Sequence, residues 1–304
     1  MRARTGRLSA IASLAILCLL GLQLDPASAL SATDHPILTS PRRIEALPTA
    51  NDRFLAWSQS PRAHPGDFAV YVRRLTGGHA TRVSGKRAAF TGGFDGNVLL
   101  YYQYSDRNHS DIHMYDVAAH HAVPVPDGVN TIRAERRPTM SGDYLLFSRH
   151  TFMRKKRTDR IVLHRISTGH EEILASIHGG LRRVGLEPGQ VSGDFATWTL
   201  CFPSGCNVYL HTISTDTTVQ LPDRGIEYGP SVSSDGTVFF GRSGYRCGSH
   251  ASLLRYSGGH ATVLHRFARN HDFSSSYAMS STDVFHDAFN CRTGDSNVAE
   301  LTVP

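Results

Sequence analysis

Four glutamates occupy a repeated position in this chain. Each stands seven or eight residues before the aspartate of a polar turn; they are Glu45, Glu135, Glu187 and Glu227. If the repeated segments form a ring, these carboxylates meet around one centre and could bind a metal ion, an amino terminus or a basic side chain. Two of them could also cleave a glycosidic bond by acid and base catalysis. The alternative is that they form ion pairs with arginines close in sequence, which are Arg42, Arg43, Arg136, Arg137, Arg182 and Arg183.

A basic run, Arg154-Lys155-Lys156-Arg157, lies in a variable segment that we expect to be a loop over residues 150–159. Clustered cationic side chains could contact phosphate or sulfate groups, and arginine can do so through two hydrogen bonds. The run has no interleaved aromatic residues for base stacking, so it does not indicate a nucleic acid partner. The alternative is a solvated loop that binds nothing.

Residues 1–29 have the pattern of an export signal. Arg2, Arg4 and Arg7 precede an apolar stretch from Leu8 to Leu24, and the small residues Ala27-Ser28-Ala29 follow it. We therefore expect a secreted or extracytoplasmic chain from Leu30, although a retained signal anchor is the alternative. No later segment is apolar for long enough to span a membrane. The net charge after residue 29 is +4, from 29 basic and 25 acidic residues, which suits weak attraction to anionic polymers.

Four cysteines remain after the signal, and an even number in an exported chain indicates disulfides. Three pairings are possible, and we favour Cys201 with Cys206 and Cys247 with Cys291. The first pair flanks a short loop between two expected strands. The second pair lies in equivalent loops of neighbouring repeats. A zinc site is the alternative, but the cysteine spacing matches no common zinc motif.

Other catalytic and ligand-binding motifs are absent from the sequence. The 17 histidines include no HExxH spacing, and His120-His121 is their only adjacent pair. The segment Gly241-Arg242-Ser243-Gly244 lacks the last glycine of a nucleophile elbow. We therefore expect no catalytic residue, no metal and no cofactor.

A polar turn followed by a β-rich run recurs six times, at intervals of about 43 to 51 residues. The turns are residues 51–53, 95–97, 141–143, 192–194, 234–236 and 281–283. Alternating apolar and polar residues then predict a further strand in each repeat, for example over 69–72 and 208–211. A period of this length, built of strands and turns, is typical of a β-propeller.

The repeats predict an all-β fold, a six-bladed β-propeller with four-stranded blades, in one domain over residues 30–304. The last repeat ends at its third strand, residues 297–303. An extended segment at residues 35–40 has no blade of its own. We expect it to supply the fourth strand of the last blade and so close the ring.

The repeats resemble the TolB-type, WD-like propeller repeats of bacterial envelope proteins. That family has a proline, then Ser-x-Asp-Gly, then an aromatic-rich strand; the matching segments are residues 230–236 and, in altered form, residues 138–143. The resemblance covers the chain after the signal, but the amino-terminal α/β domain of TolB is missing. It implies a propeller that binds proteins or peptides at its central funnel, although a fold alone does not decide function.

We therefore interpret the chain as a non-catalytic binding module for a protein, a peptide or an anionic cell-envelope polymer. The ligand would bind the funnel face, which carries the loops between the second and third strands and the connections between blades. The alternative is a polysaccharide lyase or glycoside hydrolase, which requires two of Glu135, Glu187 and Glu227 in one pocket.

Overall fold

A computed structural model describes residues 32–106, 109–153, 156–179, 185–222, 225–244, 247 and 251–303. Every regular element in these ranges is a β-strand, apart from the short 3-10 turn η1 (Ile213–Thr215). The predicted export signal lies outside the described residues. Within the described ranges, no helix has the length and apolarity needed to cross a membrane.

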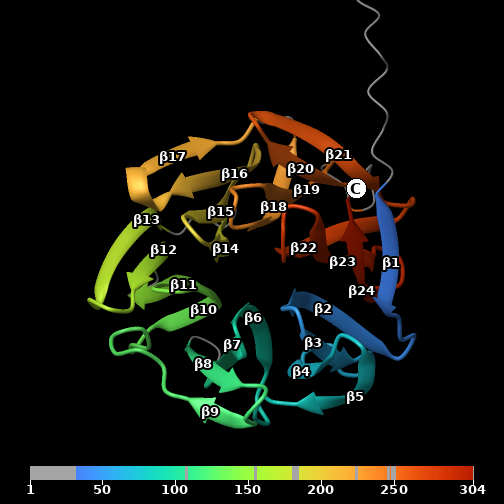
Figure 1. The fold of residues 1–304 in the computed structure, drawn as a ribbon, viewed down its shortest axis with the longest axis horizontal. Helices are drawn as coiled ribbons and strands as arrows, with labels where there is room; N and C mark the ends of the chain where they lie inside the picture. Colours follow the sequence, from blue (N-terminus) through green and yellow to red (C-terminus); the bar gives the residue numbers. More distant parts are fainter. Residues whose placement is uncertain are drawn as a thin grey trace, which may run out of the picture. The chain divides into compact units, whose positions relative to one another are not determined.

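Most strands pair antiparallel with their neighbours in chain order, and the sheets follow one another around a common centre (Figure 1). Three separate sets of four consecutive strands each form one sheet. The first set is β2 (Arg43–Ala50), β3 (Phe54–Pro61), β4 (Ala69–Arg74) and β5 (Gly77–Arg82), and the second is β14 (Gly185–Ser192), β15 (Phe195–Phe202), β16 (Gly205–Thr212) and β17 (Thr217–Gln220). The third set is β18 (Ile226–Val232), β19 (Val238–Ser243), β20 (Ser252–Ser257) and β21 (His260–Arg266). Each is a four-stranded sheet, as the repeat pattern predicts.

The largest sheet contains eight strands in two antiparallel groups. The first group is β6 (Ala89–Asp95), β7 (Val98–Tyr104), β8 (Ser110–Asp116) and β9 (His121–Val123). The second is β10 (Ala134–Ser141), β11 (Tyr144–Met153), β12 (Lys156–Arg165) and β13 (His170–His178). A single parallel bridge between Ala134 and Ser110 joins the two groups.

The first and last strands of the chain belong to one sheet. This sheet contains β1 (Thr33–Leu38), β24 (Ser296–Thr302), β23 (Asp283–Asn290) and β22 (His271–Ala278). Strand β1 pairs antiparallel with β24, from Thr33 opposite Thr302 to Leu38 opposite Val298. The amino-terminal strand therefore covers an edge of β24 that would otherwise be open.

The core lies between successive sheets, since most central strands bury both faces. In β11, for example, Leu145 and Phe147 pack in one apolar cluster, whereas Leu146 packs in the next. A further cluster joins the first and last sheets through Leu55, Trp57 and Phe285. Burial on both faces explains why the second strands have nearly continuous apolar runs.

The innermost strand of each group has an irregularity at the same place. The register shifts lie at 46/49, 91/94, 136/139, 188/191, 228/231 and 273/275. Leu47 and Arg137 have positive φ angles of 52° and 50° there. A bulge changes the direction of the side chains that follow it. These bulges therefore decide which residues face the centre of the molecule.

The described residues of the basic run belong to strand β12 and not to a long loop. Strands β11 and β12 continue through most of residues 150–159, with Thr151 opposite Thr158 and Phe152 opposite Arg157. The expectation of a loop was wrong because threonine and phenylalanine favour extended backbone and can pair across a hairpin.

Candidate functional site

The innermost strands enclose a small cavity, which we call the central cavity. Residues of β2, β6, β10, β14 and β22 line it, and its volume is about 50 Å³. It has room for a few water molecules or one small polar group. The lining residues Leu47, Gly92, Arg137 and Gly189 all belong to the bulged parts of their strands.

Two hydrogen-bonded side chains form the floor of the central cavity. The Tyr277 hydroxyl donates to the carbonyl of Phe94 and accepts from its backbone N–H, both at 3.1 Å. The Gln190 amide bonds the backbone N–H and carbonyl of Ala278 at 3.0 and 2.9 Å. Both side chains also line a second cavity of about 170 Å³ on the other side. They therefore separate the two cavities and join sheets that are not consecutive in the chain.

Arg137 is the one cationic residue among those that line the central cavity. Its Nε atom donates to Glu187 Oε2 at 2.9 Å, and about a third of the side chain (35%) is exposed. Burial opposes the charged form, but Glu187 together with Tyr102 and Asp287 outweighs this effect, so the pKa of Arg137 is raised. The cavity therefore presents a guanidinium group that is permanently charged and fixed at one nitrogen.

Most other polar side chains of the cavity bond within the protein. Ser275 donates to buried Asp287 at 2.6 Å, and Ser276 lies 2.8 Å from the Ser231 hydroxyl. Burial raises the pKa of Asp287, although hydrogen bonds from Ser275 and Leu47 act in the opposite direction. Arg137 is therefore the group best placed to contact a ligand.

The glutamates with the repeated spacing do not line the central cavity. Glu135 is completely buried, and its Oε1 accepts from Arg149 Nε at 2.9 Å and from the Thr131 hydroxyl at 2.7 Å. Burial raises its pKa even though these contacts favour the charged form. Glu227 is also completely buried and accepts from Arg242 at 2.9 and 2.5 Å.

The prediction that these carboxylates meet around one centre is wrong. The glutamates precede the bulges in their strands, so the change of side-chain direction at the bulge does not apply to them. Glu135 and Glu227 instead face arginines directly opposite them on the second strand. Glu45 faces Gln59 in the same way; it is buried, and its Oε2 has no hydrogen-bond partner. Burial raises the pKa of Glu45 to about 7. Only Glu187 reaches the cavity region, through its contact with Arg137.

The structure describes only part of the basic run at residues 154–157. Arg154 and Lys155 lie outside the described residues, as does the side chain of Lys156. Arg157 is half-exposed and donates to buried Asp159 at 2.6 Å. At least one cation of the run is therefore engaged in an ion pair within its own hairpin.

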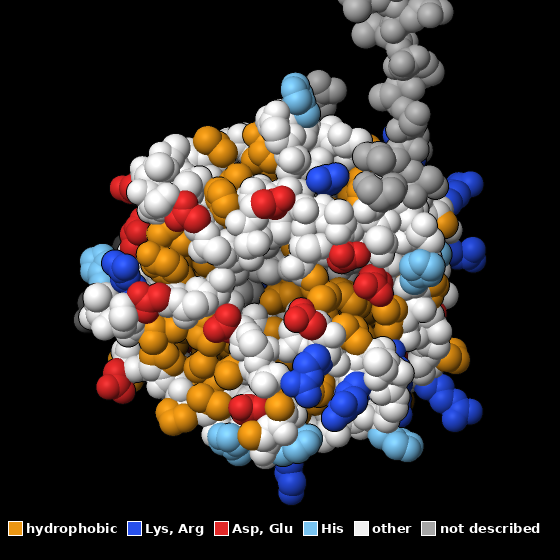
Figure 2. Space-filling view, viewed as in Figure 1, with side chains coloured by type: hydrophobic (Ala, Val, Ile, Leu, Met, Phe, Trp, Pro, Cys, Tyr) orange, Lys and Arg blue, Asp and Glu red, His pale blue; other side chains and the backbone are white. Residues whose placement is uncertain are grey.

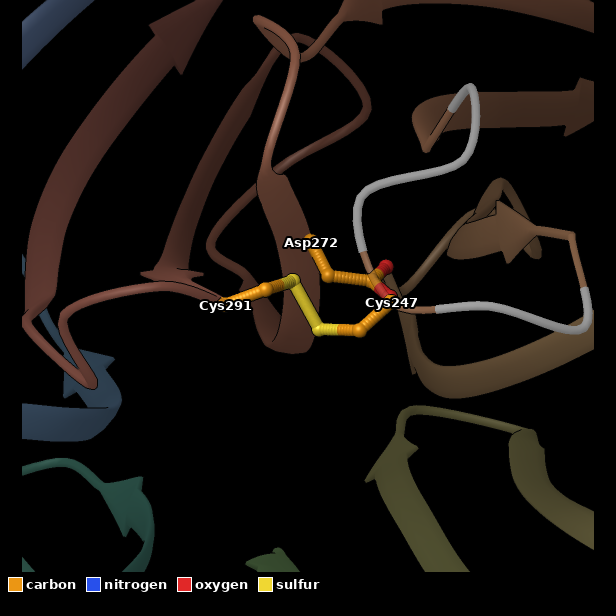
Figure 3. A group of neighbouring side chains, drawn as sticks. All are labelled: Cys247, Asp272 and Cys291. Atoms are coloured by element: carbon orange, nitrogen blue, oxygen red, sulfur yellow. A yellow bond between two sulfur atoms is a disulfide. The ribbon is translucent and has the colours of Figure 1, made fainter.

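The cysteines form the two favoured disulfides. Cys201 and Cys206 join paired positions of β15 and β16, with an S–S distance of 2.07 Å. Cys247 and Cys291 are bonded at 1.95 Å, and Asp272 of β22 lies beside them (Figure 3). Because all four sulfur atoms are in disulfides, they offer no thiolates to zinc.

A larger groove lies on the face of the molecule opposite the funnel face. This face carries the turns between first and second strands and between third and fourth strands. Its volume is about 280 Å³, and its charged or titratable lining residues are Arg53, Arg73, Arg74, His79 and His120, with no carboxylate among them. Figure 2 shows one face of the molecule, with acidic side chains around the centre and most Lys and Arg side chains nearer the edge. The groove was not predicted because its residues come from turns of two different repeats.

No family model matches the chain, and no curated protein matches it. Solved structures do resemble it. TolB from Acinetobacter baumannii aligns with a TM-score of 0.53 at 12% identity, over 82% of this chain and 63% of TolB. The acylaminoacyl peptidase of Pyrococcus horikoshii aligns with a TM-score of 0.52 at 11% identity, over 81% of this chain and 43% of the peptidase.

The β-propeller domain of the Trilobed protease from Pyrococcus furiosus, described as having an open velcro topology, aligns with a TM-score of 0.50 at 11% identity, over 86% of this chain and 84% of that domain. The likeness is one of fold. At such low identity it supports a TolB-like β-propeller and leaves the ligand to be argued from the site.

Proposed function

We propose that this protein is an exported binding module built on a closed six-bladed β-propeller. The four-stranded groups would be the blades, and β1 would complete the last blade through its pairing with β24. The two disulfides and the sequence pattern of residues 1–29 support an extracytoplasmic location.

The ligand would be a protein or peptide that places an anionic group, such as a carboxylate, in the central cavity. The observation that carries this proposal is the Arg137 guanidinium, held by Glu187 in a cavity whose other polar groups mostly bond within the protein. A fixed arginine binds a carboxylate through charge-assisted hydrogen bonds. The volume of about 50 Å³ suits one such group, so the surrounding loops of the funnel face would bind the rest of the ligand.

A peptide-display experiment tests the proposal. Residues 30–304 would be screened against random peptides with free carboxyl termini, and each binder would be remade with an amidated terminus. Amidation and Arg137→Gln should each weaken binding about 10- to 100-fold, since either change removes one partner of a charged hydrogen bond. Arg136→Gln is the matched control, because Arg136 is adjacent but stacks on Tyr104 outside the cavity lining. Equal affinity for both peptide forms would contradict the proposal.

A second candidate ligand is an anionic envelope polymer bound in the groove of the opposite face. The groove has cationic side chains and no carboxylate in its lining, which favours a chain of phosphate or sulfate groups. Two measurements distinguish the candidates: polymer binding should not respond to Arg137→Gln, and it should fall steeply with added salt.

The glycosidase and lyase alternative requires two of Glu135, Glu187 and Glu227 in one pocket, and the described residues do not bring two of them together in any of these cavities. Glu135 and Glu227 are buried and bonded to arginines, and none of the three cavities described above is lined by a glutamate. We therefore do not propose it.

A further inference from the structure

A cluster of three metal-binding side chains lies where two neighbouring sheets meet. Glu172 comes from β13, His211 from β16, and Asp216 ends the turn η1. One ligand atom from each lies within 4.8 Å of the other two. We propose that these residues bind one divalent transition-metal ion, zinc in the first instance, which would link the sheet of β13 to the sheet of β16.

His211 is the observation that distinguishes this cluster from an ordinary acidic patch. The residue is 1% exposed, and its Nε2 atom has no hydrogen-bond partner. The nearest carboxylate oxygen is Glu172 Oε1 at 3.9 Å, too far for a hydrogen bond. A buried nitrogen without a partner is costly. An ion between Nε2 and the two carboxylates would satisfy it.

The other ring nitrogen of His211 is already oriented. Nδ1 lies 3.0 Å from the Thr218 hydroxyl on β17. When Nδ1–H donates to that oxygen, Nε2 carries the lone pair, 3.9 Å from Glu172 Oε1, and this is the tautomer that a metal bound at Nε2 requires. Thr218 is thus a positioning residue for the proposed site.

The geometry needs only a small adjustment to hold zinc. Ligand atoms of one tetrahedral zinc ion lie roughly 3.3 Å apart, given bonds of about 2.0 to 2.2 Å. The side chains that would move are the carboxylates of Glu172 and Asp216, and both are partly or fully exposed. Three protein ligands would leave a fourth position for water.

The test uses tag-free residues 30–304, freed of metal with EDTA and titrated with zinc chloride by calorimetry. We expect one zinc ion per chain, a higher thermal midpoint with zinc, and visible absorption from bound cobalt. Glu172→Gln and Asp216→Asn should each weaken zinc binding at least tenfold; asparagine tolerates the left-handed backbone of Asp216, whose φ is 49°. Thr218→Val should weaken binding about 10- to 100-fold.

His170→Gln is the matched control. His170 is an exposed histidine on β13, the strand that carries Glu172, but it lies outside the cluster. It should leave zinc binding unchanged. The proposal is overturned if zinc gives neither heat nor a thermal shift. It is equally overturned if the carboxylate variants bind zinc as the wild type does, or if His170→Gln weakens binding as much as they do. The carboxylate variants avoid any change to buried His211 itself.

Discussion

The backbone conformation of Arg137 decides which side chain the central cavity presents to a ligand. Its φ of 50° places a non-glycine residue in the left-handed region, next to the register shift of β10. Leu47 adopts nearly the same φ in β2, and Gly229 does so in β18. Such backbone is strained by about 1–3 kcal/mol and concentrates at functional sites. The bulge turns Arg137 inward while Glu135, two residues earlier, faces Arg149.

Buried Glu45 should make stability depend on pH. Its pKa is raised from 4.5 to about 7, so the folded protein holds a proton that the unfolded chain releases above pH 4.5. The stability contributed by the neutral carboxyl is therefore complete below about pH 4.5 and is lost as pH rises through about 7. The loss is about 3 kcal/mol for a pKa change of this size.

Glu45→Gln should remove this dependence, because an amide does not titrate. Urea unfolding at pH 4.5 and pH 8 would measure the free energy of unfolding of wild type and variant. We expect the variant to gain stability relative to wild type at the higher pH. Asp67→Asn, a change at an exposed carboxylate, is the control and should not reproduce this gain. An equal pH response of wild type and Glu45→Gln would contradict the assignment.

At the residue scale, the sequence spacing predicted where the glutamates lie on their strands but not the direction in which their side chains point. The glutamates do occur at matched places on innermost strands, yet their arginine partners Arg149 and Arg242 stand 14 and 15 residues later. That separation is set by strand pairing and is not visible as a local motif. Arg137 was expected to pair with a glutamate close to it in sequence. It pairs with Glu187 instead, because of a positive φ angle that cannot be inferred from the residue type.

The repeated turn has a structural role at the scale of single elements. Asp143 accepts hydrogen bonds from the backbone and hydroxyl of Ser167 at 2.7 and 2.6 Å, and Asp194 does the same with Ser214 at 2.8 and 2.5 Å. The aspartate of one turn thus fixes the turn that follows the third strand. Because this contact recurs, the repeat was readable from the sequence, as were the strands and the disulfide pairs.

The two disulfides should differ in their contribution to stability. Cys247–Cys291 spans 44 residues of sequence, whereas Cys201–Cys206 spans five. Cross-linking restricts the unfolded chain more when the loop is longer, which gives about 4 kcal/mol for the first pair and about 2 kcal/mol for the second. Denaturant unfolding of the two double Cys→Ser variants would measure this difference. A greater loss from the Cys201–Cys206 pair would contradict the loop-length account.

For the whole molecule, the proposed closure of the ring depends on the pairing of β1 with β24. Ile37 and Leu38 of β1 pack against the cluster of Leu55, Trp57 and Phe285. A chain that begins at residue 41 loses these contacts and exposes the edge of β24. We expect a loss of at least about 2 kcal/mol in the free energy of unfolding, together with self-association through the open edge.

A chain that begins at residue 32 keeps β1 intact and is the control. Unfolding and analytical ultracentrifugation of both chains would measure the effect. Equal stability of the two chains would contradict the proposed role of β1 in closing the ring. The sequence could predict this strand because the last repeat is one strand short, but the contact itself joins segments more than 250 residues apart.

The most direct test of the account is a crystal structure of residues 30–304 with the tightest free-carboxyl peptide from the display experiment. We predict that the peptide carboxylate lies in the central cavity, within hydrogen-bonding distance of the Arg137 guanidinium, and that the rest of the peptide contacts the funnel-face loops. A peptide bound in the groove of the opposite face, with the central cavity unoccupied, would contradict it.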